Sequence, residues 1–443
     1  MKSADVVIAG AGVAGCLAAR DLARKGYGVV VLEKGSRELL GHDWWDTLET
    51  NIFDTVDIPA PGPQELKGSF TFDIHTPLGP TGVTTVMPPS RVNIDRAILA
   101  RRLVKYAEEA GAEIRFNSPA ISPVLEDGSV AGARAAAPDG SEYEIPASLT
   151  LDATGHAGAL RSRLPKNWGI ETRLRREDFV TCYREIREDT TGGAGKSILI
   201  IGDGPGAQWV ARNEPGFVDV LACVMDGRGR RDPREMVTEL AARDGGVGEK
   251  VVRGGYSERI PVRRGLDCFT APGFMIAGDS ASMANPLNGS GVSTALHAAS
   301  MAAKTADRAF RRGRFDAETL WPYNVEYKRT RDGKFAKLYM FQKFVSSEPV
   351  ENFHLMLERN IMPSANTWEM EDGMSPAAGL GALPRLFSLA ERPDFLARLL
   401  FTFHLVFRLE EHYGNFPRSY HPRAFRRWVR RTRRLLRMAP GGR

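Results

Sequence analysis

Cysteine is scarce in this sequence. The chain has four cysteines in 443 residues and no C-x-x-C pair. They are Cys16, Cys182, Cys223 and Cys268. Because they are scattered, we expect reduced thiols in a cytosolic protein, rather than a disulfide framework or a zinc cluster. We expect no metal site.

Long apolar runs are also missing. None reaches the roughly 20 residues that a membrane-spanning helix needs. The apolar stretch at residues 6–15 follows Asp5 and is interrupted by glycines, which argues against a signal peptide. Apolar and charged fractions of 42% and 26% are ordinary for a soluble globular protein. We therefore expect a cytoplasmic protein with two or three lobes around a shared core.

Acidic residues are absent from positions 418–443, which contain ten arginines. The chain has a formal net charge of +6, so residues 1–417 carry a net charge of about −4. The basic charge is therefore a property of the C-terminal segment and not of the whole fold.

The first forty residues have the pattern of a dinucleotide-binding unit. A short apolar strand at 5–9 is followed by G-x-G-x-x-G, a helical pattern at 13–25, and a second apolar strand that ends before Glu33. The glycines permit a tight turn and close approach of a pyrophosphate, while the helix N-terminus attracts its charge. An acid about twenty residues on is placed to bind ribose hydroxyls. We expect cofactor contacts from Gly10, Gly12, Val13, Ala14, Gly15, Glu33 and Lys34.

A second segment, MIAGDSASMANPLNGSGVSTALHAAS, combines one acid with an unusual loss of side-chain bulk. An apolar run at 274–277 ends in Gly278 and Asp279, and Pro286 and a series of small residues follow. Such a backbone leaves room for a large group to lie against it. Together with the N-terminal position of G-x-G-x-x-G, this segment favours FAD over NAD as the resident dinucleotide.

With both segments in view, residues 1–310 resemble a large flavoprotein group. It includes para-hydroxybenzoate hydroxylase-like monooxygenases, flavin-dependent halogenases and geranylgeranyl reductases. Two further pieces carry the resemblance: an R-x-x-x-D segment with Arg91 and Asp95, and LDATGHAGALR at 151–161. The resemblance implies that Asp279 accepts a hydrogen bond from a ribityl hydroxyl and that residues 285–291 follow the isoalloxazine ring. The FAD contacts it implies are Arg91, Gly278, Asp279, Pro286, Gly289, Ser290 and Gly291.

The resemblance also implies an α/β fold of two interleaved lobes. A Rossmann-type FAD-binding lobe would comprise residues 1–40, 88–165 and 265–310. An antiparallel-sheet substrate lobe would comprise residues 41–87 and 166–264. Residues 311–443 would form a C-terminal helical region that ends in the basic tail. Within this plan, residues 130–145 have the pattern of a hairpin.

Three reactions are compatible with this scaffold, which does not itself determine chemistry. The spacing from Asp279 to N-P-L-x-G-x-G most resembles geranylgeranyl reductases, although Ser290 stands where an acid is commoner and their Cys-Gly motif is missing. This favours hydride transfer at a carbon–carbon bond of an apolar substrate by a reductase or dehydrogenase. A monooxygenase or a halogenase is the alternative, although W-x-W-x-I-P is absent. A non-catalytic flavin-binding electron carrier is a third hypothesis.

The stretch GHDWWDTLE follows the second strand and carries candidate reactive side chains. His42, Asp43 and Asp46 are suitable as acids, bases or orienting groups. Trp44 and Trp45, together with Trp209, are candidates for an apolar substrate pocket. The alternative is that the tryptophans pack beneath a loop and that His42 is structural.

The electron source and the macromolecular partners are less constrained. No second G-x-G-x-x-G is present, so NAD(P)H would bind transiently, or a flavin reductase partner would supply electrons. Residues 416–443 contain a basic amphipathic helical pattern. Its apolar stripe would pack on the protein itself or lie on an anionic membrane surface, which would make the protein peripheral. Nucleic-acid binding is the least favoured of the three.

Overall fold

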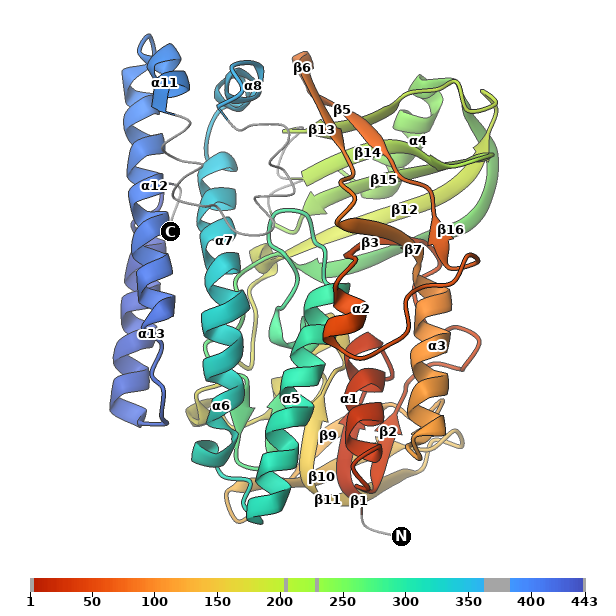
Figure 1. Ribbon diagram of the computed structural model, residues 1–443, viewed down its shortest axis with the longest axis vertical. Helices are drawn as coiled ribbons and strands as arrows, with labels where there is room; N and C mark the ends of the chain where they lie inside the picture. Colours follow the sequence, from red (N-terminus) through yellow and green to blue (C-terminus); the bar gives the residue numbers. More distant parts are fainter. Residues whose placement is uncertain (1–3, 203–205, 228–230, 362–382, 441–443) are drawn as a thin grey trace.

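A computed structural model of the protein describes residues 4–202, 206–227, 231–361 and 383–440. Its elements form two large sheets, with helices packed against them (Figure 1). The predicted α/β class, with a Rossmann-type sheet, an antiparallel sheet and C-terminal helices, is confirmed. The predicted lobe boundaries remain a prediction.

The first sheet is mainly parallel and has the order β17-β18-β11-β1-β2-β8, and β10 and β9 extend it through β11. Val6–Ala9 are fully buried, as expected for a central parallel strand. The predicted hairpin is confirmed, because β10 pairs antiparallel with β11. The strands are β1 (Ala4–Ala9), β2 (Val29–Leu32), β8 (Glu113–Arg115), β9 (Ala120–Glu126), β10 (Ser129–Ala136), β11 (Glu142–Asp152), β17 (Thr270–Ala271) and β18 (Phe274–Ile276).

Helix α1 (Val13–Ala23) packs between α3 (Arg96–Glu109) and α5 (Val292–Arg312) (Figure 1). Its small residues, and the alanines of α5, permit a close approach of the two helices. Helix α3 begins where the Asp95 carboxylate accepts hydrogen bonds from the backbone N–H groups of Ala97 and Ile98. The aspartate of the R-x-x-x-D segment therefore caps this helix.

The second sheet is mainly antiparallel and has the order β16-β12-β15-β14-β13-β5-β6. One face is covered by α4 (Pro233–Asp244), and the other bears a separate apolar cluster. The strands are β5 (Thr71–Thr76), β6 (Gly79–Val86), β12 (Phe179–Asp189), β13 (Ser197–Ile201), β14 (Gly206–Glu214), β15 (Phe217–Met225) and β16 (Val247–Pro261).

A small third sheet lies between the two larger ones (Figure 1). Its strands β3 (Trp45–Glu49) and β4 (Leu66–Lys67) both pair with β7 (Arg91–Asp95). Strand β3 contacts α5, and β7 leads directly into α3. This sheet therefore holds the GHDWWD stretch between the dinucleotide-binding helices and the second sheet.

The expectation that all four cysteines are reduced is wrong for two of them. Cys182 on β12 and Cys223 on β15 are directly opposite each other, with 4.1 Å between their Cα atoms, and form a disulfide. Cys16 and Cys268 are buried free thiols. Sequence spacing did not reveal the pair because 41 residues separate two positions that meet only through strand register.

The C-terminal region is helical, as expected, and α12 packs along α7 (Figure 1). The helices are α6 (Ala317–Tyr327), a π-helix (Lys328–Asp332), α7 (Gly333–Val345), α8 (Val350–Glu358), α11 (Leu383–Leu386), α12 (Pro393–Gly414) and α13 (Pro422–Arg437). Short helices elsewhere are α2 (Ile52–Thr55) and 3₁₀ turns at Gly155–Ala157, Arg161–Arg163, Lys166–Trp168, Arg176–Asp178, Gly278–Ala281 and Phe387–Leu389. In the described part of the chain, no helix is both long and apolar enough to cross a bilayer.

The apolar stripe of α13 packs on the protein itself. Phe425, Trp428 and Leu435 are buried, and the Trp428 ring stacks on His412 of α12 with 4.9 Å between centroids. On the same helix, the arginines lie on the exposed face. The self-packing interpretation of the tail is therefore confirmed for 416–440; residues 441–443 lie outside the described part.

Buried ion pairs attach the helical region to the rest of the molecule. Lys328 of the π-helix pairs with Asp332, whose carboxylate also accepts a hydrogen bond from the Gly265 N–H at 2.7 Å. Asp267 lies between Arg264, at 2.7 Å, and Arg433 of α13, at 2.8 Å. Removing one partner from such a buried pair is strongly destabilising.

Candidate cofactor and active site

The G-x-G-x-x-G turn lies at the carboxyl end of β1, where open α/β sheets bind ligands. Gly10 has a φ of +100°, and a Cβ there would lie 2.3 Å from the Ala153 carbonyl oxygen. A Cβ at Gly15 would lie 1.9 Å from the Gly10 oxygen. At Gly12 a Cβ would meet nothing within 4 Å. The first and third glycines therefore serve packing, and the second faces open space.

Helix α1 begins at Gly12 with no side-chain cap, so its first-turn N–H groups, which include those of Val13 and Ala14, are available to an anion. Glu33 stands beside this turn. Its carboxylate accepts hydrogen bonds from the N–H groups of Ala11 and Gly35, both at 2.8 Å. Lys34, which follows it, is exposed.

The second predicted cofactor segment folds against the first. A Cβ at Gly278, whose φ is +69°, would lie 3.5 Å from the Ala14 Cβ and 3.7 Å from the Ala295 Cβ. Helix α5 begins at Gly291, again without a side-chain cap. Two uncapped helix N-termini, those of α1 and α5, therefore flank one region of the molecule.

Asp279 lies beneath the start of α5. Its Oδ1 would be 3.3 Å from a Cβ at Gly291. Burial raises its pKa, Arg96 opposes this, and the nearby Glu258 and Asp46 carboxylates raise it further. In the parts of the chain that the structure describes, no hydrogen-bond donor reaches this carboxylate, which suits it to a ligand hydroxyl.

Residues 285–291 form the predicted side-chain-poor ribbon. The Asn285 N–H donates to the Ser290 carbonyl at 2.7 Å, and the Gly289 N–H donates to the Asn285 carbonyl at 2.9 Å. Gln342 of α7 donates to the Pro286 carbonyl at 2.5 Å. Gly289 has a φ of +74°, and a Cβ there would lie 3.4 Å from the Ile260 Cδ1 atom. The ribbon is thus held by α7 and faces β16.

Arg91, the other predicted cofactor ligand, lies at the start of β7 and is almost fully buried. Its Nη1 is 3.2 Å from a Glu49 carboxylate oxygen on β3. Taken together, the uncapped helix N-termini, the unpaired Asp279 carboxylate and the open space at Gly12 fit a dinucleotide with a polyol chain, as FAD has.

His42 lies in a polar and aromatic cluster next to this region. Its ring stacks parallel to Trp44 with 4.5 Å between centroids, and its Nδ1 is 3.4 Å from the Tyr256 hydroxyl and 3.9 Å from a Glu258 oxygen. Burial, and then the positive charges of Arg96 and Arg184, hold its pKa well below 6.5. His42 is therefore neutral near pH 7 and able to accept or pass on a proton.

The two aspartates of the same stretch are occupied by arginines. Asp46 is 2.9 Å from Arg96 and 3.7 Å from Arg184. Asp43, whose side chain is about half exposed, is 2.7 Å from Arg253. Of the three predicted catalytic residues, His42 is the one whose nearest described partner of opposite charge, a Glu258 oxygen, is as far away as 3.9 Å.

The three predicted pocket tryptophans do not all meet. The Arg184 guanidinium contacts both Trp44 and Trp209, with its carbon 5.6 and 5.2 Å from their ring centroids. Trp45 packs instead on Phe217, with 6.3 Å between centroids. Trp44 and Trp45 belong to one buried cluster with Ile186, whereas Trp209 packs against the apolar cluster of the second sheet.

Sequence reasoning missed four residues of this cluster. They are Arg96, Arg184, Tyr256 and Glu258. No motif marks them. The period-two spacing of Tyr256, Glu258 and Ile260 was the one available signal, and it shows only that these side chains share a face.

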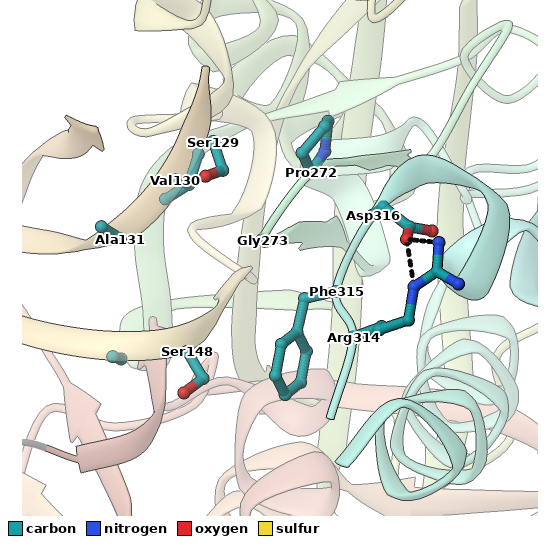
Figure 2. Close-up of a pocket in the computed structure, with 10 residues that line it drawn as sticks. Ser129, Val130, Ala131, Ser148, Pro272, Gly273, Arg314, Phe315 and Asp316 are labelled. Carbon is teal, nitrogen blue, oxygen red and sulfur yellow. Dashed lines mark hydrogen bonds and ion pairs between the residues drawn. The ribbon is translucent and has the colours of Figure 1, made fainter. Parts of the chain in front are cut away.

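A surface hollow elsewhere is not part of this site. It lies near the amino end of β1, where Ala4 pairs with Ala147 in the middle of β11, and the G-x-G-x-x-G turn is at the opposite end of β1. Figure 2 shows its residues, including the ion pair between Arg314 and Asp316. The lining residues are Ser129, Val130, Ala131, Ala147, Ser148, Pro272, Gly273, Arg314, Phe315 and Asp316.

Comparison with known families supports this interpretation of the site. Residues 5–184, which include the G-x-G-x-x-G turn and the first part of β12, match the family described as FAD dependent oxidoreductase. The protein is an FAD-dependent oxidoreductase. FAD is accordingly its cofactor.

Individual relatives of this oxidoreductase extend the comparison over the whole chain. A digeranylgeranylglycerophospholipid reductase of Sulfolobus acidocaldarius is 27% identical over 447 residues, which cover 98% of this chain and 97% of that protein. A geranylgeranyl bacteriochlorophyll reductase-like protein from Thermoplasma acidophilum has the same fold, with a TM-score of 0.75 at 19% identity, over 91% of this chain and 100% of that one. A flavin-dependent brominase aligns with a TM-score of 0.62 at 15% identity, over 89% and 100% of the two chains.

Proposed function

We propose that this oxidoreductase reduces carbon–carbon double bonds of an apolar, isoprenoid-type lipid. The similarity to the Sulfolobus acidocaldarius reductase over nearly the full length of both chains supports this substrate class. So does the N-P-L-x-G-x-G ribbon, which resembles the geranylgeranyl reductase form.

The observation that carries the proposal is an apolar surface opposite the ribbon. Val180, Leu221, Met225 and Val262 form one buried cluster on the second sheet, and Ile260 packs against it. Ile260 also reaches Gly289. A substrate between this surface and the ribbon would lie against apolar side chains, as a polyprenyl chain requires.

The oxidoreductase would hold FAD through the two uncapped helix N-termini, Glu33, Arg91 and Asp279. Bound and reduced, FAD supplies a hydride to a carbon–carbon double bond. His42 would take part in proton transfer. Asp43 and Asp46 would position it through their arginines, and Trp44 and Trp209 would line the substrate pocket.

NAD(P)H or a separate flavin reductase would supply the electrons. Anaerobic mixing of the FAD-loaded protein with NADPH or NADH distinguishes the two sources. Bleaching of the flavin absorbance supports direct reduction, whereas bleaching only after a flavin reductase is added supports a partner.

The decisive experiment is anaerobic incubation of dithionite-reduced holoenzyme with a geranylgeranyl lipid. Product masses that rise in steps of two hydrogen atoms, with matching flavin reoxidation, support the proposal. No mass change with any geranylgeranyl lipid would contradict it.

The second candidate is a monooxygenase or halogenase, because the brominase shares the fold. Its test is the same reduced holoenzyme mixed with labelled oxygen, the lipid and bromide. Labelled oxygen or bromine in the product would favour this candidate.

Residues 416–443 would also bring the protein to an anionic membrane surface. Helix α13 has eight exposed arginines: Arg423, Arg426, Arg427, Arg430, Arg431, Arg433, Arg434 and Arg437. Anionic headgroups attract such a cluster of positive charge. Because Trp428 is buried, deleting the helix would damage the core, so charge substitutions are the better test.

The suitable variant is Arg426→Gln with Arg430→Gln and Arg437→Gln. We expect it to sediment less than the wild type with anionic vesicles, and neither protein to sediment with neutral vesicles. Arg101→Gln with Arg308→Gln and Arg312→Gln, three exposed arginines elsewhere, is the matched control. Equal sedimentation of all three proteins would contradict membrane contact through α13.

A further inference from the structure

Strand β16 presents three side chains in one row toward the cofactor region. Tyr256, Glu258 and Ile260 pair with successive alternate positions of β12 without a register shift between them, so they share one face. Ile260 is the residue that reaches Gly289 of the ribbon. Glu258 therefore lies one strand repeat from a residue that contacts the proposed flavin ribbon, on the apolar surface described above.

Glu258 differs from the other carboxylates of the cluster in its partners. Asp46 and Asp43 have arginines within 3 Å, whereas the nearest basic side chain to Glu258 in the described part of the chain is His42, 3.9 Å away. Burial raises the pKa of Glu258, and the more distant positive charges of Lys34 and Arg96 counter this only in part.

His42 connects Glu258 to the rest of the cluster. Its Nδ1 also lies 3.4 Å from the Tyr256 hydroxyl, which accepts a hydrogen bond from the Asp43 N–H at 2.9 Å. The charged and titratable side chains near Glu258 and His42 on neighbouring elements are Lys34, Arg96, His156, Arg184 and Asp279. Positive charges around His42 disfavour its protonation, so a proton shared by the two side chains belongs on the carboxyl.

We propose that Glu258 is the proton donor of the reduction and that His42 returns protons to it. The inference rests on the proposed function. As the double bond receives a hydride on one carbon, the O–H bond of Glu258 breaks and its proton forms a C–H bond at the other carbon. The O–H electron pair stays on the carboxylate, which then recovers a proton from solvent through the His42 ring.

The first test asks whether Glu258 carries a proton near neutral pH, and it needs no substrate. Infrared difference spectra of the FAD-loaded protein across pH 5–9 should contain a protonated-carboxyl band that disappears as pH rises. The band should be missing in Glu258→Gln and intact in Glu249→Gln, an exposed glutamate on the same strand. A band that Glu258→Gln leaves unchanged, or no band at any pH, overturns the inference.

The second test measures product formation in a single turnover of reduced holoenzyme with a geranylgeranyl lipid. We expect Glu258→Gln to be slower by about 10²–10⁴-fold with unchanged FAD affinity, and Glu258→Asp to recover part of the rate. The wild-type rate should fall as pH rises through the Glu258 pKa, and the variant rate should not. Equal rates overturn this inference alone, whereas a wild type that reduces no double bond overturns the proposed function as well.

Discussion

At the scale of single residues, the glycines of the G-x-G-x-x-G turn have different structural roles, although all are written as the same residue in the motif. Gly15 has no room for a methyl group, because the Gly10 oxygen would be 1.9 Å away, and Gly12 has room on every side. Glycine is needed at position 15 for close packing, and at position 12 it leaves access for a phosphate.

This difference gives the first prediction. Gly12→Ala should unfold at nearly the wild-type temperature without FAD but bind FAD at least about tenfold more weakly, because its methyl group enters the space a phosphate needs. Gly15→Ala should lower the unfolding temperature of the apoprotein as well. Differential scanning fluorimetry and flavin fluorescence titration measure both effects. A Gly12→Ala protein with normal FAD affinity would contradict the assignment of this surface.

The second prediction concerns Asp279, whose pKa is raised mainly by burial. A carboxyl whose pKa is raised in the folded state lowers the free energy of unfolding as pH rises from its unfolded pKa to its folded pKa. In that window the unfolded chain releases the proton more readily than the folded one does. Asp279→Asn should therefore stabilise the apoprotein at pH 8 while weakening FAD binding by about 1–3 kcal/mol, through loss of a charged acceptor. Calorimetric unfolding and FAD titration test the two effects separately. A variant that is both less stable and weaker in FAD binding would count against the assignment of Asp279 as an FAD ligand.

At the scale of elements, the packing of α13 on α12 depends on an uncharged histidine. His412 Nε2 is 2.8 Å from the Thr432 hydroxyl and 3.2 Å from the Trp428 carbonyl oxygen. Burial, and then the charge of Arg431, lower its pKa to about 4. The arginines that make the exposed face basic thus also disfavour protonation at the buried face.

The third prediction follows from this pKa. The unfolded histidine, with a pKa of about 6.5, binds more protons than the folded one between pH 6.5 and 4, so stability falls as pH drops through that window. His412 alone should account for roughly 3 kcal/mol by pH 4. His412→Gln should be less stable at pH 7.5 but lose less stability on acidification, as measured by urea unfolding at several pH values. Parallel pH profiles for both proteins would exclude His412 as the cause.

At the scale of the whole molecule, the sequence predicted what local patterns determine. The β1–α1–β2 unit and the Gly-Asp segment depend on nearby residues, so their motifs were sufficient. The Cys182–Cys223 pair depends on the register of β12 and β15, which no local pattern reports. Glu258 and Tyr256 were missed for the same reason, since they meet His42 across more than 200 residues. Contacts between residues far apart in the sequence are the part of a fold that the spacing of residues within a motif does not determine.

The fourth prediction tests whether these distant pairings make one cooperative unit. Strand β3 is tied to β12 through Asp46 and Arg184, and α13 to the loop before β17 through Arg433 and Asp267. If such links couple both sheets and the C-terminal helices, FAD bound at α1 should stabilise all of them together. At a free FAD concentration of 100 Kd the gain is about 2.7 kcal/mol, or about 3 °C for a chain of this size.

Far-UV circular dichroism and tryptophan fluorescence should then report one transition that FAD moves by the same amount in both signals. The fluorescence includes Trp209 in the second sheet and Trp428 in α13, both distant in sequence from the first helix. Asp267→Asn, which leaves the buried Arg264 without its partner, should lower the temperature of that shared transition. Two separate transitions, of which FAD moves only one, would show that the sheets unfold independently and that the ion pairs between them carry little coupling.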